Sequence, residues 1–312
     1  MGLDQAMHLV SYACAALFVV IVLTRVISLA RLPLHLRWEL YPVAHEKGRA
    51  HYGGSYLEEL DWWTKPRHTS VVGEAKVMIP EILLLAGVRH KNKSMWARTF
   101  PFHFGLYLLI GATVLMLVNG IVLAAGGSAP WLATITMILG YAGAGLGMLG
   151  ALALLFRRLL NVEYREFTVA GDYMNLLFFI VAMGVALIGQ VATDPDFSRM
   201  QGFFAGLVTL GSYEPAMGIS GIQAVGVVLF SLLMAYIPAT HMAHFFTKWF
   251  MYHDIRWSDE PLERGGKIEA QVNEALQMKP TWAASHIGAD GKKNWVDIAT
   301  SPGFPEEPEE DK

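Results

Sequence analysis

Four histidines in or beside long apolar stretches are the residues of this chain best suited to redox chemistry. They are His8, His103, His241 and His244. A neutral imidazole is a good axial ligand for haem iron, and an imidazole at membrane depth needs a polar partner. His103 follows the beginning of one apolar stretch, and His241 lies near the end of another. If both stretches are membrane helices, the two imidazoles lie at similar depth and can bind one iron from opposite faces.

Each of these histidines also has a purely structural explanation. An imidazole near the membrane surface can bond a backbone carbonyl group or a lipid phosphate, which is the alternative for His103 and His241. His244 follows His241 by one helical turn, so we expect it beside the cofactor or at the surface. The simplest interpretation of His8 is an interfacial histidine. The alternatives for His8 are ligation of a second haem, with Met116 as partner, and contact with a quinone.

Basic side chains are expected at the same membrane face as His103 and His241. They can pair with the propionates of a haem, or they can anchor the chain at the cytoplasmic surface. The residues concerned are Arg98, Arg157, Arg158 and Lys248.

Five apolar stretches must position these side chains. Each is long enough to cross a bilayer, which takes about 20 residues. Charged residues are only 16% of the chain, which argues against both a disordered chain and an ordinary soluble enzyme. We therefore predict an all-α fold, an integral membrane bundle of five transmembrane helices. The stretches run approximately from Ala6 to Ala30, Phe100 to Ala124, Trp131 to Phe156, Tyr173 to Ala192 and Ile219 to Phe246.

Two features of the last three stretches bear on the space around a cofactor. Pro238 can kink the fifth stretch beside His241. The third stretch carries small residues, which favour close helix packing or leave room for a flat macrocycle. These residues are Gly140, Gly143, Gly147 and Gly150.

The distribution of Lys and Arg predicts the orientation. Residues 31–100 contain eleven of them, residues 157–172 contain three, residues 125–130 contain none and residues 193–218 contain only Arg199. The positive-inside rule then places the amino terminus outside and the carboxyl terminus in the cytoplasm, in an inner (cytoplasmic) membrane.

The chain is expected to have two parts. Residues 1–250 form the membrane domain, including a cytoplasmic loop over residues 31–100, and residues 251–312 form a cytoplasmic tail. We expect a surface helix around Val71–Val88 and a tail helix near Glu263–Met278. The loop and the beginning of the tail are candidate docking surfaces for a cytoplasmic partner. The acidic ending fits a solvated tail.

The single cysteine, Cys14, limits the redox chemistry that the chain can support alone. One cysteine forms neither an intramolecular disulfide nor an iron–sulfur cluster, and no CxxCH motif attaches a haem covalently. Any cofactor is therefore bound non-covalently or belongs to partner subunits. The net charge of −3 gives no indication of nucleic-acid binding.

Two segments of the chain resemble a known family. They are PFHFGLYLLIGATV at 101–114 and IQAVGVVLFSLLMAYIPATH at 222–241. With five spans and an outer amino terminus, they resemble the gamma subunit of respiratory nitrate reductase, a membrane cytochrome b. They are still more similar to the membrane subunits of heterodisulfide-reductase-like complexes. The loop at 37–68 is similar to the cytochrome b subunit of the sulfate reducers' transmembrane complex, which contains a tetrahaem cytochrome c.

The resemblance implies a particular set of haem ligands. In the gamma family, two histidines ten residues apart on span two and two histidines eighteen apart on span five bind two stacked b haems. His103 and His241 match the pair on the cytoplasmic side. Thr113 and Gln223 stand where the outer pair is expected. The resemblance therefore implies one haem b with both ligands present and leaves the second without either.

The implied function is electron transfer in anaerobic respiration, by a non-catalytic subunit of an oxidoreductase complex. The expected partners are a cytoplasmic iron–sulfur subunit similar to heterodisulfide reductase and, outside, a periplasmic multihaem cytochrome c or menaquinone. The main alternative is a haem-free membrane anchor of a redox complex. A transporter is weaker, because the centres of the spans lack ionisable residues.

Overall fold

The computed structural model describes residues 2–33, 43–44, 55–66, 68–258 and 260–301. These residues are mainly helical, as expected, with one pair of two-residue antiparallel strands, β1 (Ala283–Ala284) and β2 (Ala289–Asp290). The chain forms two compact units. The first contains Met1–Thr24 and Lys76–Ala243, and the second contains Arg25–Ala75 and His244–Lys312. The expected division at residue 250 remains a prediction, because these units are defined by internal packing and not by membrane depth.

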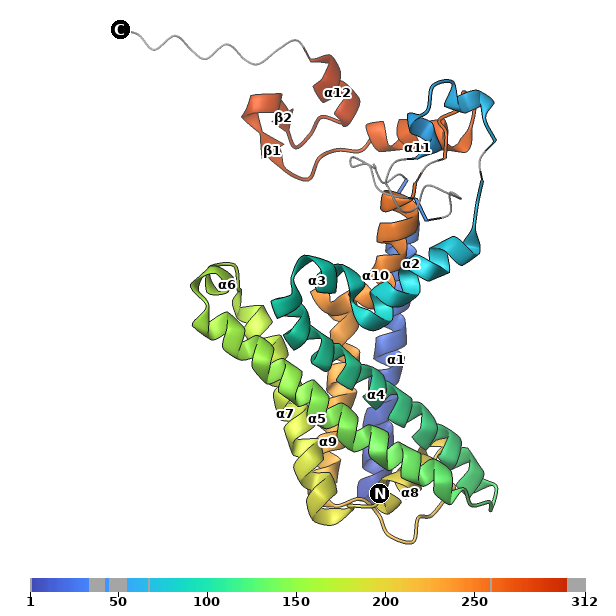
Figure 1. Ribbon diagram of the computed structural model, residues 1–312, viewed down its shortest axis with the longest axis vertical. Helices are drawn as coiled ribbons and strands as arrows, with labels where there is room; N and C mark the ends of the chain where they lie inside the picture. Colours follow the sequence, from blue (N-terminus) through green and yellow to red (C-terminus); the bar gives the residue numbers. More distant parts are fainter. Residues whose placement is uncertain (1, 34–42, 45–54, 67, 259, 302–312) are drawn as a thin grey trace. The chain divides into compact units, whose positions relative to one another are not determined.

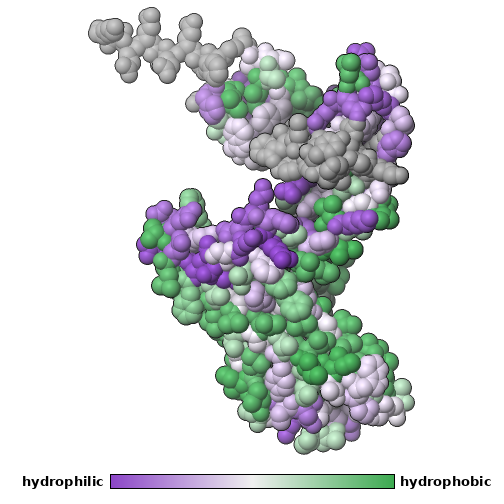
Figure 2. Space-filling model, viewed as in Figure 1, coloured by the Kyte–Doolittle hydropathy of each residue, from purple (hydrophilic) through white to green (hydrophobic). Residues whose placement is uncertain are grey.

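Five helical segments of the described chain are long and apolar enough to cross a membrane, which confirms the expected fold class (Figure 1). The orientation of the termini remains a prediction. In Figure 2, hydrophobic residues cover much of the surface of the helices in the first unit. The five segments are α1 (Leu3–Ala30), α4 (Lys93–Ala124), α5 (Pro130–Leu160), α7 (Ala170–Thr193) and Gly221–Ala239, which joins α9 (Gly221–Tyr236) to the 3-10 turn η3 (Ile237–Ala239).

The ends of two spans differ from the expected positions. Helix α4 begins at Lys93, before Phe100, because the side chain of Asn92 accepts a hydrogen bond from the backbone of Met95 at 2.9 Å. The fifth span ends at Ala239 and not at Phe246. Pro238 has no backbone N–H to continue an α-helix, so α9 gives way to the 3-10 turn that contains it.

This early ending changes the setting of His241. His241 lies beyond the fifth span, in the 3-10 turn η4 (His241–Ala243), and α10 (His244–Phe250) follows. The predicted effect of Pro238 on the chain beside His241 is therefore confirmed.

The glycines of α5 serve helix packing. A Cβ atom on Gly150 would lie 2.3 Å from the backbone nitrogen of Phe102, and one on Gly143 would lie 2.9 Å from the carbonyl oxygen of Gly105. Side chains fill the space beside the other two, since Gly147 meets Met183 and Gly140 meets Phe197. The expectation of helix packing at this stripe is borne out.

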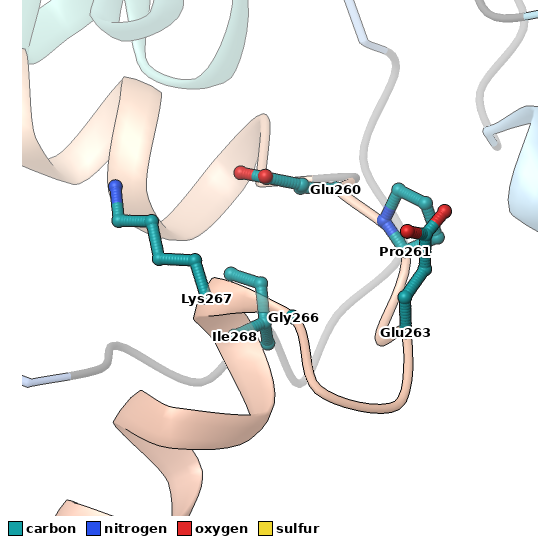
Figure 3. A pocket seen from close by; sticks show the side chains of 6 residues that line it. All are labelled: Glu260, Pro261, Glu263, Gly266, Lys267 and Ile268. Atoms are coloured by element: carbon teal, nitrogen blue, oxygen red, sulfur yellow. The ribbon is translucent and has the colours of Figure 1, made fainter.

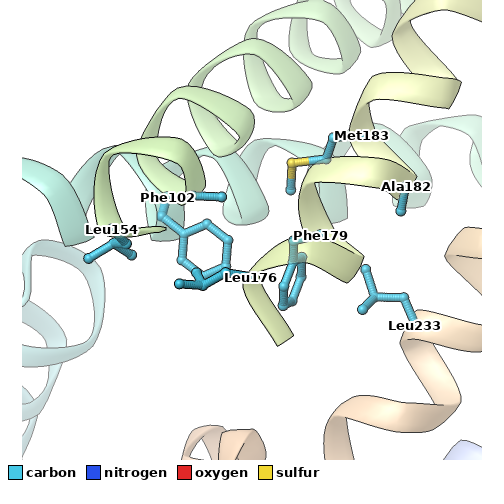
Figure 4. Close-up of a cluster of buried hydrophobic side chains, with 8 residues drawn as sticks. Phe102, Leu154, Leu176, Phe179, Ala182, Met183 and Leu233 are labelled. Atoms are coloured by element: carbon cyan, nitrogen blue, oxygen red, sulfur yellow. The ribbon is translucent and has the colours of Figure 1, made fainter. Parts of the chain in front are cut away.

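The core of the first unit lies where α4, α5, α7 and α9 meet. Helix α5 packs closely on α4 and on α7, and α7 packs on α9. In Figure 4, Phe102, Phe179 and Met183 point into the same space, and the rings of Phe102 and Phe179 meet edge to face at 4.9 Å. The cluster is completed by Ala151, Leu154, Leu176, Ala182 and Leu233.

The expected surface helix is present as two shorter helices, α2 (Val71–Leu84) and α3 (Ala86–Lys91). Leu85 separates them because its φ of 51° is left-handed. The expected tail helix is α11 (Lys267–Leu276). Lys267, its first residue, lines a small pocket together with Glu260 and Glu263 (Figure 3). The acidic ending lies outside the described residues, as does most of the loop at 37–68.

The remaining elements are short. They are η1 (Tyr56–Glu58), η2 (Trp62–Thr64), α6 (Val162–Glu166), α8 (Ser198–Val208), the π-helical turn η5 (Met251–Arg256), η6 (Ser285–Ile287) and α12 (Trp295–Thr300).

Candidate functional site

His103 lies on α4 with one ring nitrogen bonded to its own helix. Its Nδ1 is 2.9 Å from the carbonyl oxygen of Thr99, and its ring meets Phe102 edge to face. Because a carbonyl oxygen only accepts hydrogen bonds, Nδ1 is the protonated nitrogen and Nε2 carries the lone pair. This is the tautomer in which Nε2 can bind iron, with the Nδ1 bond fixing the ring.

His241 lies beside two polar residues at the beginning of α7. Its Nε2 is 3.4 Å from Oδ1 of Asp172 and 3.5 Å from Nδ2 of Asn175, while 65% of the side chain is exposed. A carboxylate beside an imidazole orients the ring, which is a common arrangement around metal-bound histidines. The turn after α9 and the beginning of α7 together position His241.

Asp172 connects His241 to the end of α5. Its Oδ2 accepts a hydrogen bond from the backbone of Val169 at 3.2 Å, which caps α7, and lies 3.5 Å from Nη1 of Arg158. Asn175, one turn further along α7, accepts a hydrogen bond from the hydroxyl of Tyr236 at 2.8 Å. We call the group Arg158, Asp172, Asn175, Tyr236 and His241 the His241 cluster.

Sequence reasoning missed three members of the His241 cluster. The spacing of Asp172 and Asn175 could have indicated two of them, because these polar residues lie three residues apart at the beginning of an apolar span. Two such polar residues face the same side of a helix. Tyr236 gave no signal, since a tyrosine near the end of a span is ordinary.

The predicted basic residues have protein partners. Arg98 donates to the backbone and the hydroxyl of Ser94, and Arg157 donates to the same hydroxyl at 2.9 Å. Arg157 also donates to the hydroxyl of Tyr164, and Arg158 donates to Thr168. Contact of these side chains with haem propionates remains a prediction. The same holds for His244 and Lys248, which lie on α10 in the second unit.

The donor set at this end of the bundle suits one haem. Each of two imidazoles has one ring nitrogen beside a protein oxygen, Thr99 O or Asp172 Oδ1. Among the described residues, no group of three or more His, Cys, Asp or Glu side chains is placed to hold a metal ion. Haem iron takes only two ligands from the protein, so the two histidines fit this group.

The opposite end of the same helices is closed by a buried polar network. Gln223 is 3% exposed, and its amide nitrogen donates to Oδ2 of Asp194 at 3.1 Å and to Oε1 of Gln190 at 3.4 Å. Its amide oxygen accepts the backbone N–H of Ser220 at 2.9 Å. Thr113 bonds back to Leu109 on its own helix. The two positions that match outer haem ligands in the resemblance are thus engaged with the protein itself.

Asp194 is the centre of that network. It is 2% exposed, and its carboxylate accepts hydrogen bonds from the backbones of Arg199 and Met200, each at 3.0 Å, and from the hydroxyl of Ser198. The amide of Gln190 donates to it at 3.0 Å. The N–H groups at the beginning of α8 and the positive end of that helix stabilise the buried charge.

Helix α8 also receives side chains from α1 and α4. His8 is buried, with Nε2 2.9 Å from the carbonyl oxygen of Phe203, and its Nδ1 has no hydrogen-bond partner among the residues that the structure describes. The amide of Asn119 donates to Gln201 at 2.8 Å. Met116, the partner considered for His8, is buried in a cluster with Ala112 and Phe197. The role of His8 toward a second haem or a quinone therefore remains a prediction.

These features define a helical membrane protein with a histidine pair at one end of its bundle. Residues 86–258, more than half of the chain, match the nitrate reductase gamma subunit family. The chain therefore belongs to this family, whose members are membrane cytochrome b subunits that transfer electrons in oxidoreductase complexes. Such members typically bind haem b. The matched segment includes both His103 and His241. None of the curated proteins compared with the chain matches it.

Proposed function

We propose that this chain relays electrons through one b haem held by His103 and His241. The donor outside the membrane is a periplasmic multihaem cytochrome c or menaquinone. The acceptor is a cytoplasmic iron–sulfur subunit similar to heterodisulfide reductase, in an anaerobic, sulfate-reducing respiration. One observation carries the proposal. The family match contains two histidines at the same end of the bundle, each with a ring nitrogen beside a protein oxygen.

When bound, the haem supplies the one-electron chemistry. The protein's residues hold and surround it. Thr99 fixes the ring of His103, and Asp172 orients the ring of His241. Arg158 balances the charge of Asp172, so the carboxylate adds no uncompensated charge near the ligand. The adjoining apolar cluster around Phe179 keeps water away from the bundle interior.

The same proposal assigns one haem to each chain, and not two. Gln223 has both amide groups engaged, and it would have to leave a buried network to make room for a ligand or cofactor. Breaking bonds to a buried carboxylate costs about 1–3 kcal/mol for each group left without a partner. The Asp194 network therefore favours polypeptide packing at that end.

The test is the visible spectrum of the purified chain and of three variants. We expect His103→Ala and His241→Ala each to abolish the paired alpha and Soret bands of a low-spin haem, while the protein still inserts and folds. The control is His90→Ala, which removes an exposed histidine of α3 and should keep the full spectrum. Full spectra in both of the first two variants would disprove the ligand assignment, and a colourless, folded wild-type chain would support the haem-free anchor.

The proposed cytoplasmic partner has its own test. Deletion of residues 31–68 should weaken binding of the iron–sulfur subunit while the spans remain, because this loop and the beginning of the tail are the proposed docking surfaces. Part of this segment lies outside the described residues. Co-purification of the two subunits measures the effect, and an unchanged yield of partner per chain would remove the docking proposal.

A further inference from the structure

Two arginines from neighbouring membrane helices converge on one serine at the end of the bundle that carries His103. Nη1 of Arg98 and Nη1 of Arg157 each donate to Oγ of Ser94 at 2.9 Å, so the two nitrogen atoms lie no more than 5.8 Å apart. Arg98 belongs to α4, and Arg157 to the last turn of α5. We call Arg98 and Arg157 the arginine pair. Two like charges at this separation repel each other unless an anion lies beside them.

The described part of the chain supplies no carboxylate to the arginine pair. None of the ion pairs among the described residues includes Arg98 or Arg157. Arg158, the next residue of α5, differs because Oδ2 of Asp172 lies 3.5 Å from it. The hydroxyl of Ser94 is a neutral acceptor and does not balance two guanidinium charges. The arginine pair therefore offers net positive charge to an anion from outside the described chain.

Neighbouring side chains fix the guanidinium of Arg157 and add a further donor. Its central carbon lies 4.2 Å from the centre of the Tyr164 ring, and its Nη2 donates to the Tyr164 hydroxyl at 2.8 Å. That hydroxyl also accepts from Nδ2 of Asn92 at 3.3 Å, which leaves its own proton to be donated. A planar guanidinium held by stacking matches the oxygen atoms of a phosphate group.

The position of the arginine pair along α4 indicates the source of the anion. The 32 residues of α4 extend for about 48 Å, whereas the hydrocarbon core of a bilayer is about 30 Å thick. The apolar stretch of the helix begins at Phe100, so Ser94 lies before it, in the headgroup region. His103 follows Ser94 by about 13 Å along the helix axis. The arginine pair is thus bonded at headgroup level, away from the level of the proposed iron.

An apolar face of α5 extends from the arginine pair into the membrane. Leu149, Phe156 and Leu160 are exposed large apolar residues, and their spacing of seven and four places them on one face of the helix. Phe156 directly precedes Arg157. A molecule bound here can therefore place a phosphate at the arginine pair and an acyl chain along this face, which favours a phospholipid over a dissolved anion.

We propose that the arginine pair binds the phosphate of an anionic phospholipid of the phosphatidylglycerol type. The hydroxyl of Tyr164 donates to the same headgroup, and one acyl chain lies along Phe156. A headgroup that carries its own ammonium group fits less well, because that group repels the two guanidiniums. In Figure 2, hydrophilic side chains border α3 and α6 at this end of the first unit. The inference does not depend on the proposed electron-transfer function.

The experiment measures binding of dioleoylphosphatidylglycerol to the delipidated, full-length protein in detergent by native mass spectrometry. We expect Arg98→Gln and Arg157→Gln each to weaken binding of the tightest-bound lipid by roughly tenfold, since each removes a charged hydrogen-bond donor. Dioleoylphosphatidylcholine should bind the wild-type protein roughly tenfold more weakly. The matched control is Arg165→Gln, which removes an exposed arginine of α6 and should change binding by less than about twofold.

A further variant keeps the test valid if Arg157→Gln fails to fold. Ser94→Ala keeps both charges and removes the hydroxyl that holds the two guanidiniums together, so binding should weaken by about threefold. The elution profile and the unfolding midpoint show which variants are folded. Unchanged binding of dioleoylphosphatidylglycerol in the folded arginine variants would overturn the inference.

Two comparisons distinguish the phospholipid from other anions. Inorganic phosphate at the same concentration should leave the lipid bound, and equal competition would overturn the inference by showing a site for a free anion. Lipid that binds only after haem is extracted would also overturn it, because haem propionates would then occupy the arginine pair. A protein without haem that binds the lipid through these arginines would contradict the proposed relay and leave the phospholipid site standing.

Discussion

The two ends of the helical bundle differ in how far their polar side chains are buried and hydrogen-bonded. At the end with His103 and His241, the ring of His241 is mostly exposed, with Asp172 beside it. At the end with Asp194, the polar side chains are buried, and one carboxylate accepts bonds from two backbone groups and three side chains. We call these the histidine end and the aspartate end.

The difference separates the end of the bundle that the protein's own groups complete from the end where we propose a cofactor. Polar groups in an apolar environment need partners, either from the protein or from a ligand. At the aspartate end, helix α8 and the side chains around it supply those partners. At the histidine end, His103 lies beside Thr99 and His241 lies beside Asp172, and we propose that a haem is their further partner.

The largest effect on stability is expected from Asp194→Ala. It removes the acceptor for the beginning of α8 and for two buried amides, so we expect a loss of roughly 3–5 kcal/mol in the free energy of unfolding. Thermal unfolding in detergent measures this loss. The matched control is Asp196→Ala, two residues away and exposed. Equal stability of the two variants would show that the aspartate end is not held together by this carboxylate.

The variant with the next largest expected effect, Gln223→His, tests whether the aspartate end can be converted into a haem site. Gln223→His should lower stability by about 1–3 kcal/mol, because it removes the buried amide that donates to Asp194 and to Gln190. It should add no haem, since Thr113 offers no second imidazole. The haem content and the unfolding midpoint are the measurements. A gain of a second low-spin haem in this single variant would show that the two ends are less different than their packing implies.

A smaller effect is expected at the histidine end from Asp172→Asn. The variant keeps the shape of the side chain and removes the negative charge beside His241. Because the oxidised haem carries more positive charge than the reduced haem, loss of the carboxylate should raise the midpoint potential while the haem remains bound. A spectroelectrochemical titration measures the shift. An unchanged potential with normal haem content would place Asp172 away from the iron.

The smallest effect concerns acid stability at Asp196. Hydrogen bonds from the backbone and the side chain of Ser198 hold the pKa of Asp196 below its usual value. A lowered folded-state pKa gives stability that is present above the unfolded pKa and is lost as the pH falls below about 4. Asp196→Asn should therefore differ slightly from wild type at pH 7 and converge with it in acid. A difference that grows in acid would contradict this assignment.

The sequence was sufficient for the five spans and insufficient for the surroundings of the candidate histidines, whose role as haem ligands remains a prediction. Apolar runs of membrane length and polar residues at their ends are local signals, so the five spans were predictable. The network of Asp194 was not, because its partners Gln190 and Gln223 come from different helices. The position of His241 beyond the fifth span depended on how far Pro238 interrupts the helix, which spacing alone does not fix.

The most direct test of the central claim is the amount of haem per polypeptide, measured with the pyridine haemochromogen assay on the purified chain. The account predicts one b haem, lost in His103→Ala and in His241→Ala. Two haems per chain would contradict it, because the second would have to occupy the end that Asp194 and its partners fill.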